Sequence, residues 1–211
     1  MNAQKHRGFT ALEIMATTVI IAIVLALLLP TLTMLRGNAT SAICVSNLRT
    51  ISTGMSAYQS DNNGYFPPVY ITATDNWWFR LNPYLGSPVG NEGRKRAGWA
   101  CPAVMEQFHE YSRRTIVYYS YGMNYVMGNA PAPIKVNAVR QPSKVILAGD
   151  TGFNASTTLA KLDASAWRGY HRGCNNLLFV DGHIQSWRIT PTSSPYLAPY
   201  KAGGTQDMWT P

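Results

Sequence analysis

The sequence is poor in charge and in cysteine. Only 13% of its 211 residues are charged, and it contains three cysteines. It also lacks a glycine-rich phosphate loop, a zinc-ligand spacing and a motif that pairs a nucleophile with a base. These absences argue against catalysis, and we expect that the protein is not an enzyme.

Charge is missing altogether from Ile14 to Leu35, a run of 22 residues. A helix of that length spans about 33 Å, enough to cross a bilayer. The run is too long for a cleaved secretory signal and lacks a small-residue exit site. Most basic residues near it precede it: Lys5, His6 and Arg7, against Arg36 alone behind it. The positive-inside rule therefore predicts a single-pass inner-membrane protein with a cytoplasmic N-terminus and an extracytoplasmic C-terminal domain.

One carboxylate, Glu13, lies at the start of the apolar stretch and needs a partner or a function there. The segment Gly8-Phe9-Thr10-Ala11-Leu12-Glu13 closely resembles the processing signal of type IV prepilins and pseudopilins, in which a basic leader ends in Gly before Phe. The resemblance implies that a prepilin peptidase cleaves between Gly8 and Phe9 and N-methylates Phe9. It also implies that Glu13 pairs with the Phe9 ammonium of a neighbouring subunit.

The C-terminal half resembles a group of pseudopilin-like proteins that carry a motif of His, nine residues and Asp-Gly. Here the motif is His171, nine residues to Val180, and Asp181-Gly182. Other landmarks of the group are also present: Cys44 to Arg49, Gly64 to Pro68, Trp77-Trp78, Asn82 to Leu85, Cys101-Pro102 and Tyr121 to Asn124. The resemblance implies a pilin-like α+β fold, with a long N-terminal helix packed on a small antiparallel sheet. It gives the C-terminal motif no biochemical role.

The apolar spacing beyond Arg36 predicts that the membrane helix continues to about Gln59. An apolar face repeats at intervals of four and three residues: Cys44, Leu48, Ile51, Met55 and Tyr58. The opposite face is polar, as expected of a helix that lies on a sheet. Gly64 is suited to a left-handed position at the helix C-terminus. Gly54 is expected to weaken the helix by about 1 kcal/mol relative to Ala.

The rest of the chain consists of short segments separated by Gly and Pro. Asp181-Gly182 between two apolar runs predicts a hairpin of 176–180 and 183–189 with a type I′ turn. Further expected elements are a short helix in 77–85, a loop at 86–98, and strands at 115–121 and 144–148, the second closed by Gly149-Asp150. The expected organisation is leader 1–8, transmembrane helix 9–35, amphipathic continuation 36–62, α+β domain 63–189 and irregular tail 190–211.

Asp150, His171, Asp181 and His183 lie at strand ends or loops near this hairpin and are the candidate metal ligands. Calcium prefers oxygen ligands, so the two histidines suit it poorly. In the structural alternative, Asp181 serves the turn, His171 makes a hydrogen bond across the hairpin mouth, and His183 belongs to the polar face of a strand. We therefore assign no cofactor, with Ca²⁺ or another divalent ion as the alternative.

The odd number of cysteines in an extracytoplasmic domain allows one disulfide and leaves one thiol. Cys44 and Cys101 both belong to landmarks of the resemblance, and their disulfide would join the helix to the domain. Cys174 would then be the spare thiol. Sequence spacing does not decide the pairing.

The resemblance also implies partners and a function. The partners are the prepilin peptidase and N-methyltransferase, other pilin or pseudopilin subunits, an inner-membrane assembly platform and the lipid bilayer. The function is that of a structural subunit of a type IV pilus-like filament or a type II secretion pseudopilus. The net charge of +8 is typical of an ordinary solvated basic surface, and together with exposed aromatic residues it would also suit a competing class, a membrane-anchored binding module for DNA or polysaccharide. A metal enzyme at His171 and Asp181 is the third class.

Overall fold

The computed structural model describes residues 9–72, 75–86, 101–107, 120–124, 127–128, 133–151, 161–162 and 169–188. The chain divides into two compact units, Met1–Asn38 and Ala39–Pro211. Several expected features lie outside the described residues: the leader with Gly8, nearly all of the loop at 86–98, most of the strand at 115–121 and the tail from 190.

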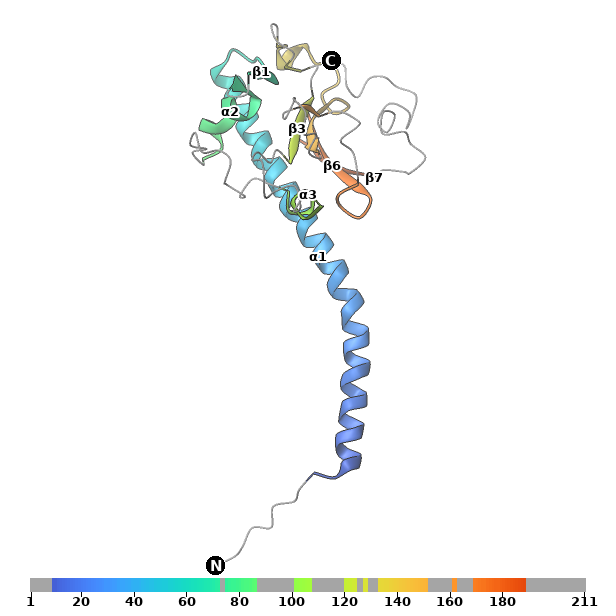
Figure 1. Ribbon diagram of the computed structural model, residues 1–211. Coiled ribbons are helices and arrows are strands. Elements are labelled where there is room, and N and C mark those ends of the chain that lie inside the picture. Colours follow the sequence, from blue (N-terminus) through green and yellow to red (C-terminus); the bar gives the residue numbers. More distant parts are fainter. Residues whose placement is uncertain are drawn as a thin grey trace, which may run out of the picture. The chain divides into compact units, whose positions relative to one another are not determined.

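Helix α1, Ala11–Asp61, is the longest element (Figure 1). Its first part contains a stretch long and apolar enough to cross a membrane, and its large apolar side chains are exposed. The threonine hydroxyls there donate to carbonyls one turn back: Thr17 to Ile14, Thr18 to Met15 and Thr31 to Leu28. An apolar solvent offers no hydrogen bonds, so this internal pairing suits a bilayer.

Glu13 has a hydrogen-bond partner in Thr10, the residue that precedes the first turn of α1. One oxygen of the Glu13 carboxylate accepts from the Thr10 backbone N–H at 2.8 Å and from the Thr10 hydroxyl at 2.9 Å. The Thr10 hydroxyl also accepts from the Glu13 N–H at 3.4 Å. This reciprocal pattern is a capping box, which satisfies N–H groups that the first turn of a helix leaves free.

The second part of α1 buries the predicted apolar face, since its members are between 0% and 7% exposed: Cys44, Leu48, Ile51, Met55 and Tyr58. The helix ends at Asp61, and Gly64 is left-handed with φ 79°, as expected. The Cβ of an alanine at Gly54 would lie 2.6 Å from Leu85 Cδ2. Gly54 therefore permits the close approach of Leu85, a role that helix propensity does not reveal.

Among the described residues of the second unit, seven short strands form two sheets. Strands β1 (Tyr70–Thr72) and β2 (Asp75–Asn76) form an antiparallel pair. The larger sheet has the order β5-β3-β4-β6-β7 and contains Lys161–Leu162, Tyr121–Asn124, Ile146–Asp150, Cys174–Phe179 and Ile184–Arg188, in that order. Three of its pairings are antiparallel, whereas β3 and β5 are parallel. The fold is therefore α+β, with one departure from the expected antiparallel sheet.

Two local expectations were wrong. Strand β4 includes Gly149 and Asp150, which were expected to close it, because Gly149 pairs with Gly122 on one side and Leu177 on the other. The predicted hairpin is present as β6 and β7, but its turn is not type I′. Gly182 is left-handed with φ 90°, whereas Asp181 is not. A single left-handed glycine fits a three-residue connection with a bulge, which the Asp-Gly pair also allows.

The described part of the unit also contains short helices. Helix α2 (Trp77–Leu81) and the 3-10 turn η1 (Asn82–Tyr84) confirm the short helix expected in 77–85. The Asn76 side chain caps α2 by accepting from the N–H groups of Trp78 and Phe79. Helix α3 (Pro102–Gln107) and the 3-10 turn η4 (Val136–Ala138) were not expected.

Candidate functional site

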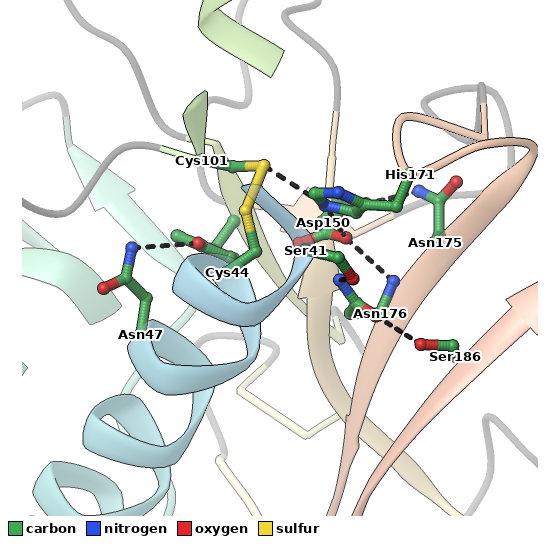
Figure 2. The surroundings of a disulfide bond; sticks show 10 residues. Ser41, Cys44, Asn47, Cys101, Asp150, His171, Asn175, Asn176 and Ser186 are labelled. Carbon is green, nitrogen blue, oxygen red and sulfur yellow. Dashed lines mark hydrogen bonds and ion pairs between the residues drawn. A yellow bond between two sulfur atoms is a disulfide. The ribbon is translucent and has the colours of Figure 1, made fainter. Parts of the chain in front are cut away.

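The sulfur atoms of Cys44 and Cys101 are joined in a disulfide (Figure 2). Cys44 lies on the buried face of α1, Cys101 immediately precedes α3, and both residues are 0% exposed. The bond closes a separation of 57 residues and joins the helix to the domain, as the family resemblance suggested. Cys174 is the free cysteine.

His171 lies directly beside this disulfide. Its Nε2 atom is 3.3 Å from Cys101 Sγ and 3.0 Å from Asp150 Oδ2. The side chains of His171 and Asp150 are 3% and 0% exposed. Figure 2 shows the imidazole between the sulfur atoms and the carboxylate. We call these four residues, Cys44, Cys101, Asp150 and His171, the buried tetrad.

A tight turn fixes the position of His171. The His171 N–H donates to the Cys174 carbonyl at 2.9 Å, and the Cys174 N–H donates back at 3.0 Å. The two residues between them are both left-handed, Arg172 with φ 55° and Gly173 with φ 84°. This is the geometry of a type I′ turn. The turn connects His171 to Cys174, the first residue of β6. The sequence did not predict this turn, because an arginine is seldom left-handed as Arg172 is here.

Asp150 is held by the neighbouring strand. Its Oδ2 accepts from the Asn176 N–H at 2.8 Å, and its backbone carbonyl accepts from Asn175 Nδ2 at 2.9 Å. Burial raises the pKa of Asp150, while His171 and the N–H of Asn176 oppose that rise. Within the described residues, Asp150 Oδ1 and His171 Nδ1 have no hydrogen-bond partner. Buried polar atoms are normally paired, so these two leave the site chemically incomplete.

The four residues expected as metal ligands do not form one group. Asp150 pairs with His171 in the interior, whereas Asp181 pairs with His183 at the exposed β6–β7 turn, with 2.6 Å between Oδ1 and Nδ1. Asp181 Oδ1 also accepts from the backbone N–H of His183, so it serves the turn. The set was therefore wrong, because Asp150 and His171 lie beside the start of β6, whereas Asp181 and His183 lie in the turn that follows its end.

The structure assembles a different ligand set. One ligand atom from each member of the buried tetrad lies within 4.8 Å of the others. Two sulfurs, one imidazole nitrogen and one carboxylate oxygen are a donor set that a borderline-soft metal ion prefers. The sequence suggested the two cysteines and, separately, Asp150 and His171. It did not indicate that all four lie together, since they come from four separate segments.

With this geometry established, comparison with known proteins adds nothing to it. The chain matches no protein-family model, no curated protein and no solved structure. Its function is therefore proposed from its own residues.

A second feature is an open hollow of about 630 Å³ at the C-terminal end of α1. Its lining mixes aromatic and polar side chains, among them Tyr58, Tyr65, Phe66, Asp61 and Arg80. The charged groups already have partners, since Arg80 binds Asp75 at 2.7 Å and Asp61 accepts from the Tyr84 hydroxyl at 3.0 Å. The hollow therefore presents aromatic surface more than free charge.

Proposed function

We propose that the protein is a structural, pilin-like subunit that is anchored in a membrane by α1 and assembled into a filament or pseudopilus. The observation that carries the proposal is the difference in burial between the two parts of α1. Its first part presents uncharged apolar side chains outward, and its second part buries one apolar face in a compact domain. A helix of this kind is suited both to storage in a bilayer and to packing with copies of itself.

The start of the helix supports the same function. Cleavage between Gly8 and Phe9 would leave the capping box intact, because Thr10 and Glu13 both remain in the mature chain. The Glu13 carboxylate has a second oxygen, Oε1, that the capping box does not use. A neighbour's Phe9 ammonium could bind that oxygen without opening the cap. Glu13 can therefore serve the helix and an intersubunit contact together.

Processing is the first test. Intact-mass and N-terminal peptide measurements on membrane-extracted protein should show a chain that begins with N-methylated Phe9. A Gly8→Leu variant is the matched control, since it changes the last leader residue and leaves the helix unchanged. That variant should keep the leader and fail to assemble. A wild-type chain that retains residues 1–8 beside an active peptidase would contradict the proposal.

Assembly and orientation are tested separately. Protease added to spheroplasts should digest the domain from residue 39 onward, and a tagged copy imaged in its native cell should appear in filaments or pseudopili. Protection of the domain until lysis would reverse the proposed orientation. A dispersed membrane signal under conditions in which other subunits assemble would remove the structural role.

The aromatic hollow favours one alternative, a membrane-anchored module that binds polysaccharide. The Tyr65 side chain, which is 41% exposed, offers apolar contact, and neighbouring amides and carboxylates offer hydrogen bonds. Full-length protein in detergent should then bind polysaccharide, and Tyr65→Ala should weaken that binding. Binding that instead falls steeply with salt and survives Tyr65→Ala would indicate DNA held by the basic surface.

A further inference from the structure

We propose that the buried tetrad is a zinc site whenever Cys44 and Cys101 are reduced, so that the same four residues hold either a disulfide or a metal ion. The inference is independent of the filament role. It starts from the convergence of two cysteine sulfurs, His171 Nε2 and the Asp150 carboxylate, whose ligand atoms lie within 4.8 Å of one another. All four residues are buried.

The distances fit a tetrahedral ion once the disulfide opens. Zinc bonds of about 2.0–2.3 Å place neighbouring ligand atoms about 3.3–3.8 Å apart. His171 Nε2 already lies 3.3 Å from Cys101 Sγ and 3.0 Å from Asp150 Oδ2. The distance between His171 and Asp150 is about 0.3 Å short of that range. The two bonded sulfurs are much closer together, and reduction moves them to a non-bonded separation. Breaking one bond therefore relieves the main crowding in a cluster whose ligand atoms all lie within 4.8 Å of one another.

The hydrogen bonding around the tetrad leaves a donor free for a metal. Asp150 Oδ2 accepts from Asn176 and faces His171, whereas Asp150 Oδ1 has no partner among the described residues. A fully buried carboxylate oxygen without a donor is costly unless a cation or a proton satisfies it. Hydrogen bonds from β6 also fix the position of Asp150. Asn175 Nδ2 donates to the Asp150 backbone carbonyl, and the Asn176 N–H donates to Oδ2. Such supporting bonds fix the direction of a metal ligand.

The donor set selects the ion. Two thiolates and an imidazole suit zinc and exclude calcium or magnesium, which take oxygen ligands. The set is also complete, because four protein ligands fill the tetrahedron and leave no position for water or substrate. The site is therefore structural rather than catalytic, and its ion would replace the covalent link between α1 and Cys101, the residue before α3, in the reduced chain.

The exchange balances chemically. A dithiol reductant gives two electrons and two protons to the disulfide, becomes a disulfide itself and leaves two cysteine thiols. Binding of Zn²⁺ to those thiols releases two protons. In the other direction, a disulfide oxidant accepts two electrons from the thiolates and two protons from solvent and becomes a dithiol, while the bond between Cys44 and Cys101 reforms and the ion is released unchanged. Zinc takes no part in the electron transfer.

The test compares two states of the full-length protein in detergent. One sample is kept oxidised, the other is reduced without oxygen, and both are given Zn²⁺, desalted and assayed for metal. We expect about one zinc per reduced chain and none above background in the oxidised chain. Co²⁺ in place of Zn²⁺ should give a thiolate-to-cobalt absorption band in the reduced sample alone. Equal metal in both states, or none in the reduced state, would overturn the proposal.

Alkylation provides a readout that needs no variant. In the reduced chain, zinc should slow the alkylation of Cys44 and Cys101 at least tenfold and leave the alkylation of Cys174 unchanged, as measured on the separated peptides.

Two substitutions outside the tetrad are matched controls: Cys174→Ser and His183→Gln should keep the metal. His171→Gln should lose it. Loss of zinc in Cys174→Ser with full retention in His171→Gln would place the metal elsewhere and contradict the assignment.

Discussion

His171 Nε2 lies 3.0 Å from Asp150 Oδ2 in the interior, while His183 Nδ1 lies 2.6 Å from Asp181 Oδ1 at the surface. The chain therefore contains the same pair of groups in two environments. The buried side chains are 3% and 0% exposed, and those at the surface are 42% and 33% exposed. Water screens and competes with the surface pair, so burial rather than distance decides which pair stabilises the fold.

Removing the buried carboxylate should be costly. We expect Asp150→Ala to lower the free energy of unfolding by about 3 kcal/mol, because it deprives the buried imidazole of its carboxylate and the Asn176 N–H of its acceptor. Asp181→Ala is the matched control and should cost less than about 1 kcal/mol. Tryptophan fluorescence during denaturant unfolding in detergent measures both. Equal losses in the two variants would show that the buried pair carries no special stability.

Reducing the disulfide should destabilise the domain. It closes a separation of 57 residues, for which the chain-entropy relation gives about 4 kcal/mol. The reduced protein, kept with a chelator, should therefore unfold at a lower denaturant concentration than the oxidised protein. Adding Zn²⁺ to the reduced protein should restore part of that loss if the buried tetrad binds it. A reduced, chelated protein as stable as the oxidised one would contradict this prediction.

Gly169 should resist substitution more than a comparable glycine. Gly169 and Gly86 both have φ 66°, so an alanine at either position meets the same backbone cost of about 1–2 kcal/mol. The Cβ of an alanine at 169 would also lie 2.8 Å from the Gly173 backbone, whereas nothing lies within 4 Å at Gly86. Gly169→Ala should therefore be the more destabilising in unfolding measurements. Similar losses would mean that the turn around His171 adjusts without cost.

Two substitutions at Glu13 separate its roles. Glu13→Gln retains a side-chain oxygen for the capping box with Thr10 but removes the charge, while Glu13→Ala removes both. If the carboxylate pairs with a neighbour's ammonium, both variants should be processed and inserted yet assemble poorly. Pulled-down assemblies, scored beside leader cleavage, measure this. Normal assembly of Glu13→Gln with failure of Glu13→Ala would assign Glu13 to the cap alone.

The exposed Asp75–Arg80 pair should give a small stability term that depends on pH. Arg80 binds Asp75 and lowers the pKa of its carboxyl. A lowered folded-state pKa contributes stability above the ordinary pKa, and that contribution is lost as the pH falls through the lowered value. Asp75→Asn should therefore cost less than about 1 kcal/mol at neutral pH and nothing in strong acid. A cost that stays constant down to low pH would exclude the ion pair as its cause.

Elements marked by a repeated apolar spacing or by a distinctive turn motif are predicted well from the sequence. The buried face of α1 follows from a spacing of four and three residues, and the β6–β7 hairpin follows from an Asp-Gly between apolar runs. The pairing between strands of the sheet is harder to predict from the sequence. Gly149 and Asp150 look like strand breakers, yet neighbours on both sides keep β4 extended through them.

The buried tetrad could not be predicted as a unit. Its four residues lie on α1, before α3, at the end of β4 and before β6, and no local pattern records the distances between such segments. The family resemblance suggested the disulfide, and strand ends suggested Asp150 and His171. Only the packing of the helix against the sheet brings the two suggestions together.

The position of the disulfide along α1 has a mechanical consequence. Cys44 begins the buried face of the helix, and the remaining members follow toward the C-terminal end. Tension applied at the N-terminal end of α1 would separate the residues of this face from the domain one after another, starting at Cys44. The bond to Cys101 stands at that starting point, so a pull reaches a covalent link before it reaches the van der Waals contacts of Leu48 or Ile51. A pull on the N-terminal end of α1 would therefore be transmitted into the domain through a covalent bond.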